Sequence, residues 1–342
     1  MRLPVDIDGS RGEGGGQILR TSLALALITG RKLRMKHIRA RRKHPGLQRQ
    51  HLACVHAAAR LAATTAGELT VGAASFELAP QPREAWAEHL EIDIGTAGST
   101  TLVVQTLLVP AIVSGRPLHA VITGGTHNPL APPFPFLDRV FLPHLRAMGA
   151  DVTLTLDKIG VMPEGGGRIV LDVRPGGKLR PLELVAAGNV VARRATAICA
   201  RLPRHVGERE LAVARERLNE PACNLIELPD DGPHNVFMVE VELASGAREL
   251  VTSHGRKGYP AEDVADDALD DLEDFLEAGV PVGEHLADQL LLPMAVAGGG
   301  RFRTLAPLSS HAETNLATIR EFLDVPIRIE SAGAMACDVI VG

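Results

Sequence analysis

Hydrophobic and polar residues between positions 3 and 183 recur in the order strand, glycine-containing turn, helix. Alternating apolar and polar residues predict strands, and apolar residues spaced three or four apart predict helices. In the first unit we expect a strand over residues 3–8, a glycine-rich turn, and a helix from Gln17 to Thr29 that ends at Gly30. Because this order returns two or three times before residue 183, we expect stacked, related α/β units.

The same patterns predict the remaining elements. Besides a hairpin over Glu68–Leu78, we expect strands over Leu33–Ala40, from Glu91, over His119–Thr123 and Asp151–Leu156, up to Val173, and over Val236–Leu243, Arg301–Leu305, Ile327–Ile329 and Asp338–Val341. Further helices are expected over Leu47–Ala63, up to Pro110, up to Met148, over Ala261–Ala278, up to Gly298, and at Ser309–Leu323.

The charge balance divides the chain. Residues 1–50 contain twelve Lys and Arg against three Asp and Glu, whereas residues 184–279 contain ten against nineteen. The basic segment suits phosphate-rich partners, which the acidic segment would repel. We therefore expect a functional core formed by residues 1–183 and 280–342, and a small, acidic α/β insert domain at 184–279. The acidic run within Ala261–Ala278 is most simply a solvated helix face.

Composition narrows the class of protein. The 342 residues are 45% hydrophobic, enough for two or three domains with a buried core. One Trp, one Tyr and eight Phe offer few stacking platforms for unpaired bases. The four cysteines lack Cys-x-x-Cys spacing, which suggests neither disulfides nor a zinc site. Without a signal peptide or a run of eighteen apolar residues, we expect a cytoplasmic protein with no membrane contact.

The segment SSHAETNLATIREFL, Ser309 to Leu323, contains the strongest candidate nucleophile. Ser310 followed by Glu313 predicts a capping box at a helix start, which places His311 in the first turn. Free N–H groups and the positive end of the helix dipole favour an uncharged imidazole there and attract phosphate oxygens. A histidine that attacks phosphorus needs both properties. The alternative is a surface histidine that merely begins a helix.

Two segments of the basic N-terminal region could bind phosphate. The glycine-rich turn from Asp8 to Arg20 matches neither the P-loop nor the dinucleotide fingerprint, but Glu13 suits a hard metal ion and Arg20 a phosphate. Both could equally be solvated residues. The strand–turn–helix junction that follows carries cationic side chains, which favour a phosphate-binding mouth over a solvated face: Arg39, Arg41, Arg42, Lys43, His44 and Arg49.

Polar residues also stand in apolar surroundings. Gln105 lies among Val and Leu residues of a predicted helix, and a buried glutamine needs hydrogen-bond partners that a ligand could supply. His285 and Gln289 are four residues apart in another helix, with Asp288 beside them, so the three side chains could reach one ligand.

Six segments, in order along nearly the whole chain, resemble the RNA 3′-terminal phosphate cyclase family: DGSRGEGGGQILR, GTAGSTTLVVQTLLVP, GGTHNPLAPP, GVMPEGGG, HLADQLLLPMA and SSHAETNL. The resemblance implies an α/β (α+β) fold of three repeated βαβαββ-type units, with a small insert domain before the last part. It also implies an ATP-dependent enzyme that converts an RNA 3′-phosphate to a 2′,3′-cyclic phosphate. AMP would first join a histidine with release of pyrophosphate, then pass to the RNA end, and finally be displaced by the 2′-OH.

The resemblance assigns roles to residues of this chain. His311 would be the adenylylated nucleophile and Glu13 the ligand of a divalent metal, Mg or Mn. The phosphate and RNA-end site would comprise Arg20, Arg39, Arg42 and Gln50. The ATP site would comprise Gln105, Pro132, Pro133, His285, Leu286, Ala287, Asp288 and Gln289. The implied partners are ATP and RNA 3′-phosphate ends, and a homo-oligomer is compatible with the sequence.

Three positions depart from the family pattern, and two other readings compete. Ile159 replaces the usual His or Arg, His285 stands where some relatives have tyrosine, and His127 is unusual in the GGT segment. One rival is a catalytically silent, cyclase-like ribosome-assembly factor, which would lack the nucleophilic histidine. The other is an enolpyruvyl-transferase-like enzyme, which needs no histidine at a capped helix start. A purely RNA-binding protein is disfavoured by the few aromatic residues and the net charge of −5.

Overall fold

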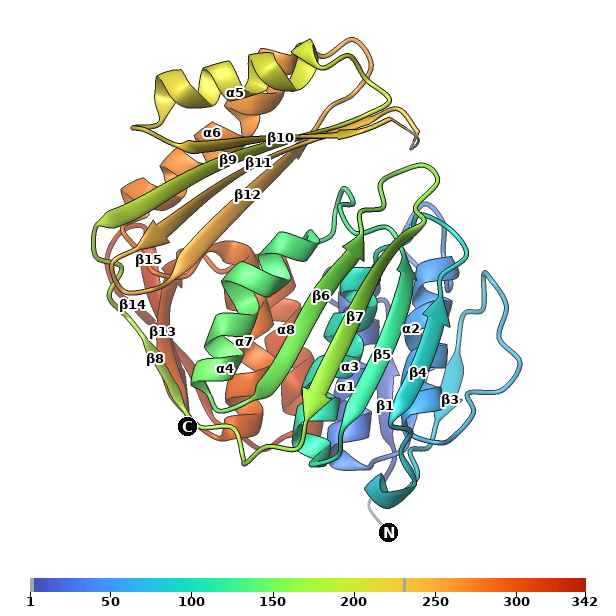
Figure 1. Cartoon of the computed structure of the whole chain (residues 1–342). Coiled ribbons are helices and arrows are strands. Elements are labelled where there is room, and N and C mark those ends of the chain that lie inside the picture. Colours follow the sequence, from blue (N-terminus) through green and yellow to red (C-terminus); the bar gives the residue numbers. More distant parts are fainter. Residues whose placement is uncertain (1–2, 230–231) are drawn as a thin grey trace.

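Strand–helix units fill most of the computed structural model, which describes residues 3–229 and 232–342 (Figure 1). The first unit is a three-stranded sheet in the order β1-β2-β3, with β1 parallel to β2 and β3 antiparallel to it. Its elements are β1 (Val5–Asp8), α1 (Gly16–Thr29), β2 (Leu33–Lys36), α2 (Arg49–Leu61) and β3 (Phe76–Leu78). As predicted, Gly30 ends α1 in the left-handed conformation, with a φ of 66°.

The second unit has a four-stranded sheet in the order β4-β5-β7-β6. A 3₁₀ turn, η1 (Arg83–Ala85), precedes it. Its elements are β4 (His89–Asp93), α3 (Thr100–Ser114), β5 (Leu118–Gly124), the π-helical turn η2 (Phe136–Phe141), α4 (Leu142–Ala147), β6 (Asp151–Lys158) and β7 (Gly167–Arg174).

The C-terminal unit repeats this topology, because its sheet order β8-β13-β15-β14 has the same sequence of parallel and antiparallel pairings. Its elements are β8 (Leu182–Leu184), α7 (Glu284–Ala297), β13 (Gly300–Leu305), α8 (Ser310–Phe322), β14 (Ile327–Ser331) and β15 (Ala336–Val341). The mixed α/β fold class expected from the sequence is confirmed.

Between β8 and α7 the chain forms a fourth sheet, β10-β9-β11-β12, with α5 and α6 on one face (Figure 1). Its elements are β9 (Val190–Ala200), α5 (His205–Arg217), β10 (Ala222–Leu228), β11 (His234–Leu243), β12 (Arg248–His254) and α6 (Ala261–Ala278). The bounds of α6 are the predicted ones. The division into a core (1–183, 280–342) and an insert domain (184–279) stays a prediction.

Central helices form the main core. Nearly every residue of α1 from Ile18 to Leu27 is buried, because α1 packs against α2, α3 and α8. Helix α3 is similarly apolar on all sides, and α7 packs on α8. None of the described helices is long and apolar enough to span a membrane.

Several sequence-based elements are wrong in extent, among them the helix predicted up to Pro110, which continues to Ser114. The predicted hairpin at Glu68–Leu78 contributes only β3, because residues 72 and 73 bond to Leu47 in the loop before α2 instead of to a neighbouring strand. The strand predicted over Leu33–Ala40 ends at Lys36, because His37 and Arg39 both adopt a positive φ of 52°, which breaks the pleat.

Candidate active site

Helix N-termini gather at one end of the repeated units. Helices α1, α2, α3 and α8 each follow a strand of a parallel pair and return along it, so they begin where those strands end. The free N–H groups and dipoles at such helix starts attract anions. This end of the core is therefore suited to phosphate groups.

His311 lies in the first turn of α8, as predicted, but the capping residue is Ser309 and not Ser310. Ser309 has an extended backbone, and its hydroxyl accepts the Ala312 N–H at 3.2 Å. The Glu313 N–H donates to the Ser309 carbonyl at 3.0 Å. His311 is consequently the second helical residue, and its side chain is exposed. An exposed imidazole at a helix start is free to meet a phosphate.

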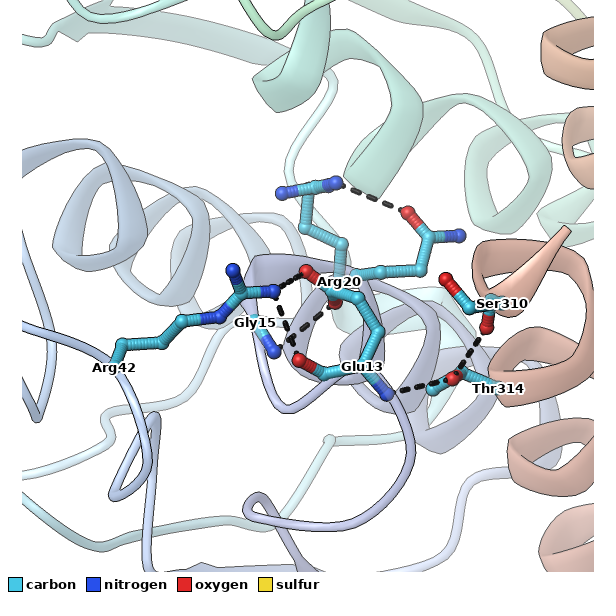
Figure 2. Close-up of polar contacts among 7 residues, drawn as sticks. Glu13, Gly15, Arg20, Arg42, Ser310 and Thr314 are labelled. Atoms are coloured by element: carbon cyan, nitrogen blue, oxygen red, sulfur yellow. Dashed lines mark hydrogen bonds and ion pairs between the residues drawn. The ribbon is translucent and has the colours of Figure 1, made fainter.

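Glu13 belongs to the glycine turn before α1 and faces the start of α8 (Figure 2). One carboxylate oxygen accepts the Gly15 N–H at 3.0 Å, and the other pairs with Arg42. Arg42 also donates to the Glu13 backbone carbonyl at 2.8 Å. The structure thus brings together two residues predicted for metal and phosphate binding.

A hydrogen-bonded network joins α1, α7 and α8 around Asp288. One carboxylate oxygen of Asp288 accepts two hydrogen bonds, from the Gln17 side-chain amide at 3.2 Å and from the Asn315 side-chain amide at 2.9 Å. Asn315 in turn accepts the Thr21 hydroxyl at 2.9 Å, and the Arg20 guanidinium donates to Gln17 at 3.0 Å. Burial raises the pKa of Asp288 to about 6, although the Asn315 hydrogen bond and the nearby His311 and Arg20 oppose this shift.

A cavity between the central helices brings four predicted residues together: Arg20, Gln105, Asp288 and Gln289. Three further polar residues on its wall were not predicted: Gln17, Thr21 and Asn315. Its apolar lining includes Leu108, Phe141 and Leu292. The buried Oε1 atom of Gln289 has no hydrogen-bond partner. An apolar pocket with a few converging polar groups, one of them unpaired, has the lining of a small-ligand site. A second hollow, around His89, His119 and Asp172 on the second unit, contains none of the predicted residues.

The other residues predicted to bind ATP differ in how accessible their side chains are. His285 is exposed, and its ring meets Phe136 edge-on at 6.4 Å between centroids. Burial of part of the ring lowers the pKa of His285. Leu286 and Ala287, by contrast, are 0% and 2% exposed and pack in the core, so their side chains are not available to a ligand. The Pro132 carbonyl accepts the Thr101 hydroxyl at 2.7 Å, and Pro133 is buried.

Two residues predicted for the phosphate and RNA-end site, Arg39 and Gln50, make hydrogen bonds within the protein. The Arg39 guanidinium donates to the His44 carbonyl at 2.6 Å, and the Gln50 side chain accepts the Ser99 N–H at 3.0 Å. Gln50 therefore ties the start of α2 to the turn before α3. Burial lowers the pKa of Arg39, and the nearby Arg42 adds to this effect.

His51 was missed by the sequence reasoning. It is the N3 residue of α2, and its Nδ1 accepts the Gln48 N–H at 3.1 Å in a capping box. Burial, followed by the charges of Arg39 and Arg20, lowers the pKa of His51 to about 3. A Cβ on Gly16 would lie 2.7 Å from both His51 Nε2 and an Arg20 nitrogen, so glycine permits this approach. The signal in the sequence is a histidine three residues after a polar helix cap.

The departures from the family pattern lie in different surroundings. His127 is 2% exposed and bonds through Nδ1 to the Thr126 hydroxyl at 2.8 Å. Burial lowers the pKa of His127 to about 3, and His254 and His234 of the fourth sheet add to this effect. Ile159 is partly buried against the core.

Glu13 stands alone as a candidate metal ligand. Within residues 3–229 and 232–342, no group of three or more His, Cys, Asp or Glu residues could hold a metal ion. Mg²⁺ often binds through one or two carboxylates together with substrate phosphates and water. A single carboxylate next to a helix start that is suited to phosphate fits that mode, and it does not fit a metal held by protein alone.

Comparisons with known proteins identify the family of the chain. The family model described as RNA 3′-terminal phosphate cyclase matches residues 11–329. A protein of Ectopseudomonas mendocina (strain ymp) with that name is 46% identical over 326 residues, covering 94% of each chain. Its namesake in Koribacter versatilis is 43% identical over 94% of this chain and 91% of its own. The Pseudomonas fluorescens namesake is 45% identical over 96% of this chain and 94% of its own. The chain therefore belongs to the RNA 3′-terminal phosphate cyclase family.

Proposed function

We propose that this protein is an ATP-dependent enzyme that converts RNA 3′-phosphate ends to 2′,3′-cyclic phosphates through a covalent histidine–AMP intermediate. The observation that carries the proposal is the position of His311. An exposed imidazole lies in the first turn of α8, beside the cavity lined by Arg20, Asp288 and Gln289. Family membership supports the overall reaction, because the three relatives bear the name of that activity.

In the first step, an imidazole nitrogen of His311 attacks the α-phosphorus of ATP. A P–N bond forms, the bond between the α-phosphorus and the bridging oxygen breaks, and pyrophosphate leaves. The cavity would hold the nucleoside, with Gln105 and Gln289 as hydrogen-bonding groups and His285 against the base. Arg20 and the helix starts would neutralise the phosphates. Such a transfer depends on positioning and charge neutralisation more than on proton chemistry.

In the second step, an oxygen of the RNA 3′-phosphate attacks the adenylylated phosphorus, and the P–N bond breaks. In the third, the neighbouring 2′-OH attacks the 3′-phosphorus, loses its proton, and displaces AMP. Arg39, Arg42 and Gln50 would hold the RNA end, because they lie around the start of α2 on the Glu13 side of the site. A divalent metal on Glu13, when bound, would neutralise charge on the ATP phosphates.

The test uses the purified protein, ATP labelled at the α-phosphate, and Mg²⁺ or Mn²⁺. We expect label on the chain that is labile in acid and stable in alkali, as a phosphoramidate is. Adding an RNA with a 3′-phosphate should discharge the label and yield a cyclic end that phosphatase no longer attacks. A protein that takes up no label would contradict the mechanism. A protein that instead binds such RNA without changing it would support the rival reading as a catalytically silent assembly factor.

A further inference from the structure

One side chain connects two segments that are 301 residues apart in the sequence, the glycine turn before α1 and the first turns of α8. The Thr314 hydroxyl accepts the backbone N–H of Glu13 at 3.0 Å. The same hydroxyl donates to the carbonyl of Ser310 at 2.7 Å. Thr314 is 5% exposed, so water does not substitute for either contact. Figure 2 shows Thr314 between Glu13 and Ser310.

The two segments meet closely because the turn has no side chain at this point. A Cβ on Gly12 would lie 2.3 Å from the Thr314 hydroxyl oxygen, and Gly12 has a φ of 56°. Most residues with a side chain avoid that conformation, and any of them would push α8 away. The turn and the helix therefore pack directly against each other at Gly12 and Thr314, with no space for a side chain between them.

The contact fixes the residues next to it. Ser310 immediately precedes His311, and the hydrogen bond to its carbonyl fixes the rotamer in which the Thr314 hydroxyl meets the Glu13 N–H. On the other side, the Glu13 N–H is held by Thr314 while its carboxylate is held by the Gly15 N–H at 3.0 Å. Both the backbone and the side chain of Glu13 are thus oriented relative to α8.

We infer that Thr314 is a positioning residue, which sets the distance between the nucleophile His311 and the carboxylate of Glu13. This inference rests on the proposed function, because it matters only if His311 attacks a phosphate whose charge is neutralised at Glu13. Phosphoryl transfer is sensitive to such spacing, and a displacement of about 1 Å can slow a reaction about 100-fold.

The experiment compares three full-length variants with the unmodified protein. Thr314→Val keeps the shape of the side chain and removes both hydrogen bonds, whereas Thr314→Ser keeps the hydroxyl. Thr318→Val is the matched control, since Thr318 lies one turn further along α8, is 3% exposed, and donates the same kind of bond to the Thr314 carbonyl at 2.8 Å. The readouts are the single-turnover rate of AMP attachment, its dependence on Mn²⁺ concentration, the Kd of ATP, and the unfolding temperature.

For Thr314→Val we expect AMP attachment to slow by about 30- to 100-fold. The Mn²⁺ concentration for half-maximal rate should rise several-fold, while the Kd of ATP stays within about twofold, because Thr314 does not line the cavity. Thr314→Ser should attach AMP at a rate within about threefold of that of the unmodified protein. Thr318→Val should attach AMP at the unmodified rate.

Two results would overturn the inference. One is a rate of AMP attachment in Thr314→Val that equals the rate of the unmodified protein. The other is equal loss of rate and unfolding temperature in Thr314→Val and Thr318→Val, which would show that buried hydroxyls of α8 serve folding alone. If the unmodified protein takes up no AMP, the proposed function itself fails, and the inference falls with it. The two failures are distinguished by the labelling of the unmodified protein.

Discussion

The side-chain amide of Asn315 donates to two oxygens of Asp288, the backbone carbonyl at 2.8 Å and a carboxylate oxygen at 2.9 Å. Asp288 is therefore held from α8 although it belongs to α7. Its carboxylate also lines the cavity assigned to ATP. Hydrogen bonds orient this carboxylate. They offset only part of the free-energy cost of burying its charge, since its pKa is raised to about 6.

This raised pKa leads to a prediction about stability and pH. The folded state holds the proton of Asp288 more tightly than the unfolded chain does, so the contribution of this group is greatest below the unfolded pKa of 3.8 and is lost as pH rises through about 6. Asp288→Asn, which cannot ionise, should raise the free energy of unfolding at pH 7–8 by about 1–3 kcal/mol relative to the unmodified protein.

Urea unfolding of both proteins between pH 4 and 8 measures this difference, which should shrink toward zero near pH 4. The exposed Asp324→Asn serves as the control for simple loss of a charge. A difference that is constant across the pH range would show that Asp288 does not titrate as its burial implies.

Gln289→Met tests the unpaired oxygen in the cavity. A buried acceptor without a donor destabilises the folded protein by about 1–3 kcal/mol, so removing it should stabilise the protein in the absence of ligand. If ATP supplies the missing donor, the Kd of ATP should rise by about tenfold. Thermal unfolding and equilibrium binding measure the two effects. A stabilised variant with unchanged affinity for ATP would place the nucleotide elsewhere.

Arg42→Ala should slow cyclisation of a 3′-phosphate RNA more than it slows AMP attachment. Arg42 belongs to the cationic strand–turn–helix junction before α2. Each charge-assisted hydrogen bond lost between its guanidinium and a phosphate should weaken RNA binding by about 1.5–3 kcal/mol. Its pairing with Glu13 implies that RNA or metal must compete for one of the two partners. Arg60→Ala, in the last turn of α2, is the control. Equal losses in both assays would assign Arg42 to ATP.

Much of the fold follows from local sequence patterns. The strand–turn–helix order, the end of α1 at Gly30 and the bounds of α6 depend on periodicity and helix-ending residues that are close together in the chain. The wrong strand end at Lys36 has a cause that the pattern does not contain, the left-handed backbone of His37 and Arg39. The prediction of Ser310 as the cap of α8 is wrong for a similar reason, because the extended backbone that a cap needs is that of Ser309.

The candidate site was predicted where residues are unusual in their local surroundings, as Gln105 and His311 are. Thr314 and Asn315 were not predicted, because a threonine and an asparagine in a helix carry no sign that their partners lie 301 and 27 residues away. Leu286 and Ala287 were predicted only because they belong to a segment that resembles the family, and their burial leaves the polar members of that segment as the candidates for ligand binding.

His311→Ala should abolish AMP attachment and cyclisation from ATP while leaving ATP binding and stability nearly intact. The side chain is exposed, the helix start is capped by Ser309, and alanine is a good helix former, so the free energy of unfolding should change by less than about 0.5 kcal/mol. The chemistry, by contrast, has no substitute nucleophile at this position. The variant should still cyclise an RNA whose 3′-phosphate already carries AMP, because that last step needs the activated anhydride and not the histidine. Label on the variant after incubation with α-labelled ATP would refute the assignment, and failure on the pre-activated RNA would mean that His311 also acts after its own adenylylation.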